Sequence, residues 1–94
     1  MTVGGSSVRS VKLSWDASVP ASKEPADAVK GYNVYRHEPH KKYEQINRVL
    51  IHETGCTDYA VTAGRTYSYQ VEAVSRLGAI SKPSNTADAD VRPR

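Results

Sequence analysis

Two histidines three residues apart are the first candidates for chemistry in this sequence. His37 and His40 lie on either side of Pro39, so we expect the end of a strand and a turn there. On a helix this spacing would bring two imidazoles together. On a strand or a turn it does not, and no third ligand is evident. We therefore prefer solvated histidines to a metal site, and we expect no metal and no other cofactor.

The single cysteine and a nearby aspartate are the next candidates. A nucleophilic Cys56 would need a base or a positive field to lower the pKa of its thiol, and Gly55, Thr57 and Asp58 supply neither. We prefer a buried core thiol. For Asp58, we prefer a carboxylate that caps a turn by accepting backbone N–H bonds to a catalytic group. One cysteine also excludes an internal disulfide and a multi-cysteine metal site.

Known catalytic sequence motifs do not occur in the chain. It contains no Gly-x-Ser-x-Gly elbow, no P-loop, no Gly-x-Gly-x-x-Gly and no His-Glu-x-x-His. Because no acid, base and nucleophile converge in the pattern, the sequence predicts a protein that is not an enzyme.

Size and charge narrow the class further. The chain has 94 residues, enough for one domain, and its 13 basic and 10 acidic side chains give a net charge of +3. This excess is too small and too dispersed to indicate a nucleic-acid partner. No apolar run reaches the length of a membrane span or of a signal-peptide core, so we expect no membrane insertion, and any export signal would lie outside this segment.

The elements that must position any site are strands. From Tyr67 to Val74, apolar and polar residues alternate with the period of a half-buried strand, and we expect this strand to be central. Further strands are expected at residues 8–15, 32–36, 43–47, 56–59 and 85–91. A long loop over residues 16–29, with two prolines, should cross between two sheets. The predicted core comprises Leu13, Trp15, Tyr32, Val34, Val61, Tyr67, Tyr69, Val71 and Ala73.

Short strands separated by turn signals, with no helical period, predict an all-β sandwich of antiparallel sheets. The predicted organisation has a linker or a ragged first strand at residues 1–6, the domain at residues 7–92 and a tail at residues 93–94. The glycine-containing start and the Arg-Pro-Arg end are typical of linkers.

Three segments match one family together. "SVKLSW" ends in a core tryptophan, "GYNVYR" gives the next strand, and "VTAGRTYSYQVEAVSRLGAISKPSN" gives a corner, a strand and a hairpin. Over roughly residues 7–91 the chain resembles a fibronectin type III domain, with Tyr67 at the tyrosine-corner position. The resemblance implies an immunoglobulin-like, Greek-key sandwich of about seven antiparallel strands. The style of these segments resembles the bacterial branch, whose modules punctuate secreted enzymes and surface proteins.

The sequence departs from the family at three places. The family's first strand is barely represented before Val8. Cys56 stands where an aromatic residue is usual, which leaves a smaller core side chain. The hairpin of residues 76–80 has no Arg-Gly-Asp, so integrin adhesion through that motif is unsupported.

Two surface features are candidates for interaction. The basic turn contains Arg36, Lys41 and Lys42 together with the two histidines, and it could meet an anionic partner or be a solvated hairpin tip. Tyr35 should lie on the outer face of its sheet, where it could stack on a sugar or a neighbouring domain, or cover the sheet itself.

The sequence thus predicts a non-catalytic module that acts as a spacer or protein-interaction domain in a larger protein, which we expect to be extracellular or at the cell surface. Its expected partners are neighbouring domains, and another protein or a polysaccharide is the further option. The alternative is a carbohydrate-binding or adhesive module that uses its outer face or loops. For that alternative only Tyr35, with Tyr43 or Tyr59, could form an aromatic platform.

Overall fold

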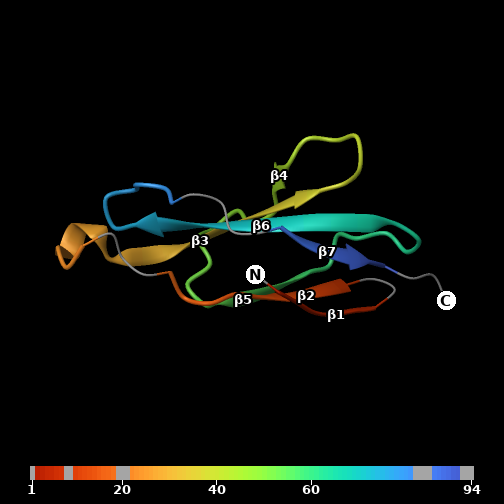
Figure 1. Cartoon of the computed structure of the whole chain (residues 1–94), viewed down its shortest axis with the longest axis horizontal. Helices are drawn as coiled ribbons and strands as arrows, with labels where there is room; N and C mark the ends of the chain where they lie inside the picture. The colour runs from red at the N-terminus through yellow and green to blue at the C-terminus, as the bar shows by residue number, and fades with distance from the viewer. Residues whose placement is uncertain (1, 8–9, 19–21, 82–85, 92–94) are drawn as a thin grey trace.

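Two antiparallel sheets form a two-layered sandwich in the computed structural model, which describes residues 2–7, 10–18, 22–81 and 86–91 (Figure 1). One sheet has the order β1-β2-β5 and the other β4-β3-β6-β7. The described strands are β1 (Thr2–Ser7), β2 (Ser10–Ser14), β3 (Val29–His37), β4 (Glu44–Gln45), β5 (Gly55–Asp58), β6 (Thr66–Ser75) and β7 (Ala87–Asp90). The predicted all-β, Greek-key sandwich of about seven strands is confirmed.

Strand β6 is central to its sheet, because it pairs with β3 on one side and with β7 on the other. Its alternation is that of the sequence: Tyr67, Tyr69, Val71 and Ala73 are buried, and the residues between them are half-buried. Ten residues long, β6 spans most of the sandwich and presents one face to the other sheet (Figure 1). Burial of this face, with its two tyrosine rings, is the main apolar contribution of the strand.

The core lies between the two sheets. All nine residues predicted for it are buried, and the structure adds Val11, Ala89 and Val91. Trp15, directly after β2, meets Tyr32 of β3 edge to face, with ring centroids 5.5 Å apart and planes at 64°. The two rings come from different sheets, so their contact holds the layers together.

The N-terminal segment differs from the simplest expectation. The sequence predicts a linker or a ragged first strand at residues 1–6, and the structure shows the strand β1, paired antiparallel with β2. Its register shifts between Val3 and Gly5, as at a bulge. Gly4-Gly5-Ser6-Ser7 has low strand propensity, so backbone pairing at the sheet edge, which the sequence pattern does not report, holds this segment in place.

Several predicted strand ends fall elsewhere. The strand expected over residues 8–15 is β2, Ser10–Ser14, and residues 8 and 9 lie outside the described residues. The strand expected over residues 56–59 is β5, Gly55–Asp58. The last strand is β7, Ala87–Asp90, and residue 85 and the predicted tail of residues 93–94 lie outside the described part of the chain.

The segment after β4 is not a strand beyond Gln45, because a side chain replaces the backbone there. Asn47 accepts a hydrogen bond from the Val34 N–H at 2.8 Å and donates to the Tyr32 carbonyl at 3.3 Å. Farther along, Ile51 exchanges two backbone bonds with Tyr32, at 2.8 and 3.1 Å. The edge of β3 is therefore satisfied without a long neighbouring strand.

The loop over residues 16–29 crosses from one sheet to the other, as predicted. Its described part contains a short 3-10 helix, η1 (Pro25–Asp27), which begins at a proline. At its far end, the Arg76 N–H donates to the Ala28 carbonyl at 3.0 Å, which joins the loop to the β6–β7 hairpin. Among the described residues, no helix has the length and apolar character that a membrane crossing requires.

Candidate functional site

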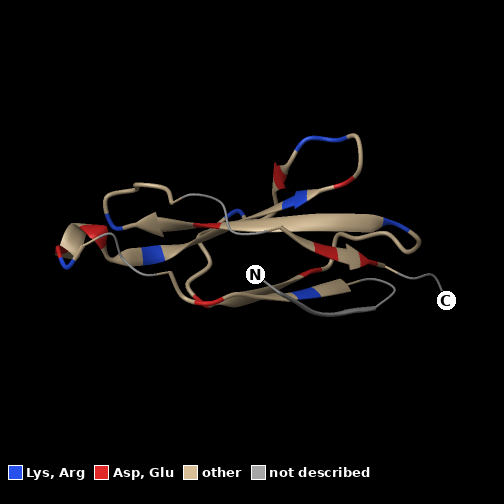
Figure 2. Cartoon of the chain, in the orientation of Figure 1, with Lys and Arg blue, Asp and Glu red and all other residues tan. Residues whose placement is uncertain are grey.

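The hairpin between β3 and β4 brings most of the predicted interaction candidates together. Pro39 and His40 form its turn, and His40 has a φ of 66°, in the left-handed region that non-glycine residues rarely adopt. Basic and acidic residues alternate around it, and β7 carries acidic residues (Figure 2). Beneath the hairpin lies an open hollow of about 410 Å³ lined by Arg36, Glu38, Lys41, Lys42, Tyr43 and Glu44.

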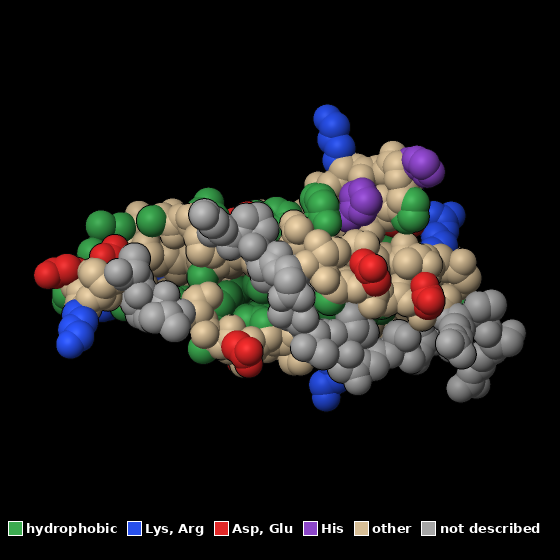
Figure 3. All heavy atoms as spheres, in the orientation of Figure 1, with side chains coloured by type: hydrophobic (Ala, Val, Ile, Leu, Met, Phe, Trp, Pro, Cys, Tyr) green, Lys and Arg blue, Asp and Glu red, His purple; other side chains and the backbone are tan. Residues whose placement is uncertain are grey.

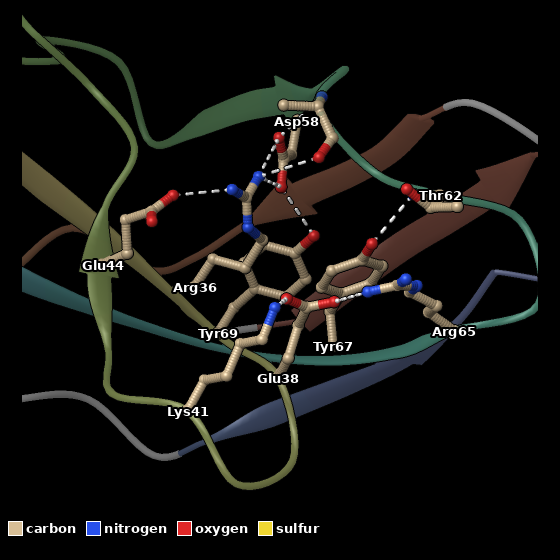
Figure 4. Close-up of polar contacts among 10 residues, drawn as sticks. Arg36, Glu38, Lys41, Glu44, Asp58, Thr62, Arg65, Tyr67 and Tyr69 are labelled. Carbon is tan, nitrogen blue, oxygen red and sulfur yellow. Dashed lines mark hydrogen bonds and ion pairs between the residues drawn. The ribbon is translucent and has the colours of Figure 1, made fainter.

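Arg36 is not the solvated cation of a basic turn, and this interpretation is corrected. It follows Val34 by two positions and so shares the inward side of β3. Its guanidinium donates to both carboxylate oxygens of Asp58, at 3.1 and 2.9 Å, and to Glu44 at 2.8 Å (Figure 4). The side chains of Arg36 and Asp58 are only 14% and 4% exposed. Arg36 therefore has little capacity left for an external anion.

Asp58 is the acceptor at the centre of this network. Besides Arg36, it accepts the Tyr69 hydroxyl at 2.8 Å and the Ala60 N–H at 3.0 Å. The last bond is the turn cap that the sequence predicted. The other two connect β5 of one sheet to β3 and β6 of the other, so the carboxylate joins the two layers (Figure 4). Among the described residues, these contacts of Asp58 are all with donors of the fold itself.

The electrostatics of the network keep Arg36 charged and Tyr69 neutral. Burial by itself disfavours the charged guanidinium, but the hydrogen bonds and charge of Asp58, with the charge of Glu44, raise the pKa of Arg36. Burial, and next the hydrogen bond to Asp58, raises the pKa of Tyr69. A charged pair with a neutral phenol donor is a stable arrangement that has no proton to exchange at neutral pH.

A second ion cluster fixes the tip of the hairpin. Glu38 accepts hydrogen bonds from Lys41 and from Arg65, each at 3.0 Å. These bonds, that of Lys41 first, lower the pKa of Glu38, so its carboxylate stays ionised. Lys41 is thus engaged within the hairpin. Of the predicted cations, Lys42 alone has no carboxylate partner among the described residues.

The three aromatic candidates lie at different places: Tyr35 on the outer face of its sheet, Tyr43 in the β3–β4 hairpin and Tyr59 after β5. Tyr35 is half-buried on the outer face, where burial, and next the charge of Glu72, raises its pKa. His37 is half-buried rather than solvated, because it stacks on Tyr43 with ring centroids 4.7 Å apart and planes at 25°. Tyr43 is 42% exposed, and Tyr59, which lies after β5, is 76% exposed. Spacing on one strand did not indicate the His37–Tyr43 pair, since it forms across the hairpin.

Cys56 is half-buried and packs against the core. Burial, followed by the charge of Asp58, raises the pKa of its thiol to about 11, so it is almost entirely protonated at neutral pH. Among the described residues, no three histidine, cysteine, aspartate or glutamate side chains are grouped as metal ligands.

The corner before β6 has the predicted tyrosine geometry. The Tyr67 hydroxyl accepts a hydrogen bond from the Thr62 N–H at 2.8 Å (Figure 4). Gly64 completes the corner with a φ of 86°, a conformation that L side chains rarely adopt.

Replacing Tyr67 by phenylalanine should lower the free energy of unfolding by about 1–3 kcal/mol, because the Thr62 N–H loses its acceptor. Urea denaturation of the purified domain measures this change. Tyr59→Phe is the matched control, since it removes a hydroxyl from an exposed ring and should stay within about 0.5 kcal/mol. Equal stability of both variants would show that the corner bond contributes nothing.

No protein-family model matches the chain, and no curated protein matches it. Among solved structures, an Fn3-like protein from Clostridium thermocellum is 30% identical, with a TM-score of 0.69 over 93% of this chain and 80% of that one. A titin module from human cardiac muscle is 25% identical, with a TM-score of 0.79 over 96% and 85%. A β-1,2-glucanase from Parabacteroides distasonis is 22% identical, with a TM-score of 0.73 over 96% and 12%.

The sandwich, the tyrosine corner and these matches define an immunoglobulin-like β-sandwich module. The chain belongs to the fibronectin type III family, as the resemblance of its sequence predicted. It spans 12% of the glucanase and 30% of a titin structure that contains several domains. Such modules are generally not catalytic, occur beside neighbouring domains in larger proteins and are also found within enzymes.

Proposed function

We propose that this domain is a non-catalytic spacer that holds neighbouring domains of a larger protein apart. The proposal rests on one observation, which is that the charged side chains of the site are bonded within the domain. Arg36 is bonded to both Asp58 and Glu44, and Glu38 to both Lys41 and Arg65, so these groups stabilise the fold and leave no convergent catalytic group among the described residues.

The path of the chain supports a spacer. β1 begins opposite Ser14, where β2 leads toward the crossing loop. β7 ends opposite Thr66, at the start of β6. Both strands run in the same direction along the long axis of 49 Å: β1 begins near the middle of this axis, and β7 runs toward one end of it (Figure 1). A domain joined before β1 and one joined after β7 would therefore be separated by part of the length of the sandwich.

We further propose a bacterial parent protein that acts outside the cell or on its surface. The family resemblance is to modules of secreted enzymes and surface proteins. Similar structures from Clostridium thermocellum and Parabacteroides distasonis, the second a glucanase, support this assignment.

Deleting this module from its parent protein should bring the flanking domains closer together, by less than the 49 Å of its long axis because β1 begins near the middle of that axis (Figure 1). Small-angle X-ray scattering, or energy transfer between labels on the flanking domains, measures the change. A spacer depends on length, so an unrelated fibronectin type III domain should restore both the distance and the activity of the parent. Restoration of the distance without the activity would contradict the spacer role and indicate a specific interaction surface.

A carbohydrate-binding role is the second candidate, and one observation favours it. The structure places an exposed tyrosine, Tyr43, on a half-buried histidine at the rim of an open hollow. An aromatic ring that is partly exposed and held in place by a neighbour is a suitable surface for a sugar ring.

A further inference from the structure

We propose that the hollow beneath the β3–β4 hairpin binds a saccharide that carries a carboxylate, with the sugar ring on Tyr43 and the carboxylate at Lys42. This inference goes beyond the spacer role and does not depend on it. It deepens the second candidate by assigning the site and the chemical class of the ligand.

An aromatic residue lines the hollow. The Tyr43 ring stacks on His37, yet Tyr43 remains 42% exposed, so part of its side chain is accessible to a ligand. The face of an aromatic ring is electron-rich, and it attracts the slightly positive C–H groups on the face of a pyranose ring. Figure 3 shows hydrophobic and histidine side chains side by side where the hairpin rises from the sheet, with a basic side chain projecting above them.

The charges around the hollow leave one cation uncompensated. Glu38 and Glu44 line the hollow. Arg36 is shared by Asp58 and Glu44, a group with one net negative charge, and Glu38 is shared by Lys41 and Arg65, a group with one net positive charge, so the two groups cancel. Lys42 also lines the hollow and has no carboxylate partner in the part of the chain that the structure describes. The hollow therefore has one uncompensated positive charge beside an aromatic ring. This pair complements a sugar with a carboxylate, such as a uronic acid.

Ion pairs hold the hairpin that lines the hollow in place. The hairpin is held at its base by the Arg36–Glu44 ion pair and near its tip by the bonds of Glu38 to Lys41 and Arg65. The volume of about 410 Å³ falls within the ~300–1,000 Å³ of small-molecule sites. A site that is already ordered loses little conformational entropy when its ligand binds.

A polyanion such as nucleic acid fits this surface less well. Binding to a phosphate backbone requires several cations along one face, whereas Lys42 alone is uncompensated here among the described residues. The hollow is also mostly lined by charged side chains, which does not suit the apolar anchors of a protein partner.

The test is a titration of the ¹⁵N-labelled domain with tetragalacturonate, followed by NMR. Binding should be weak, with a Kd on the order of 1 mM, because few contacts are made. The shifts should centre on the hairpin of residues 38–44. The fully methyl-esterified tetramer, which keeps the rings and removes the charge, should bind about five-fold more weakly.

Two variants separate the parts of the site. Tyr43→Ala should weaken binding about five-fold or more, and Lys42→Gln should make the acid and its ester bind equally. Lys12→Gln is the matched control for Lys42→Gln, because it removes an exposed lysine from β2 of the other sheet, and it should bind as the unchanged domain does.

Results of three kinds would each overturn the proposal. The first is no shift with tetragalacturonate at about 20 mM, well above the expected Kd. The second is equal binding of acid and ester by the unchanged domain, or binding that survives Tyr43→Ala. The third is equally tight binding of a single-stranded oligonucleotide, which would indicate a general polyanion surface. The spacer role would be untouched by any of them.

Discussion

Replacing Asp58 by alanine is expected to lower the free energy of unfolding by about 3–5 kcal/mol, the range for breaking a buried ion pair from one side. The variant leaves the Arg36 guanidinium, whose side chain is 14% exposed, and the Tyr69 hydroxyl, on a fully buried ring, without their acceptor. The remaining exposure of Arg36 favours the lower end of this range, since water can reach part of the guanidinium.

Urea denaturation followed by tryptophan fluorescence measures this loss, because the chain has one tryptophan, Trp15, in its core. Asp88→Ala is the matched control. Asp88 is also an acceptor on a strand, from the Ser68 hydroxyl at 2.7 Å, but it is exposed, and its loss should cost less than about 1 kcal/mol. Equal effects of the two substitutions would contradict a structural role for Asp58.

Replacing Trp15 by alanine is expected to cost about 3–5 kcal/mol, as other truncations of buried aromatic residues do. Trp15 is 7% exposed, and its removal leaves a cavity beside Tyr32, which loses its edge-to-face partner between the sheets. Circular dichroism during urea denaturation measures the loss, since this variant has no tryptophan to report it.

Two further variants define the Trp15 result. Trp15→Phe keeps part of the ring volume and should lose less than Trp15→Ala, so it remains measurable even where the alanine variant does not fold. Leu77→Ala removes a side chain that is 79% exposed and should stay within about 0.5 kcal/mol. A change of that small size in Trp15→Ala would show that Trp15 is not a core residue.

The strands that carry the apolar core could be predicted because the alternation of apolar and polar residues is a local pattern. In β6, alternate residues from Tyr67 to Ala73 point to one side, and this period is written in the sequence itself. β1 was less predictable, since its strand is held by pairing with β2 and not by the preferences of its glycines and serines. The end of β4 also differs from the prediction. There the Asn47 side chain, and not its backbone, accepts the hydrogen bond from the Val34 N–H of β3.

The partners of the polar side chains could be identified only from the structure. Arg36 was grouped with the neighbouring histidines and lysines as a basic turn, although its spacing from Val34 put it on the inward side of β3. This two-residue spacing was the one feature of the sequence that indicated an inward-facing Arg36. Its partner Asp58 is 22 residues away and in the other sheet, and no local pattern pairs two such residues. What the site leaves for binding, Tyr43 and Lys42, could be separated from the rest only after these pairs were known.

We infer that the Arg36–Asp58 pair stabilises the fold by joining the two sheets. A double-mutant cycle of Arg36→Ala and Asp58→Ala, measured by urea denaturation, tests it most directly. The claim predicts that the double variant is more stable than the sum of the single losses implies, by a coupling energy of about 2–3 kcal/mol. Losses that simply add, within about 0.5 kcal/mol, would contradict it.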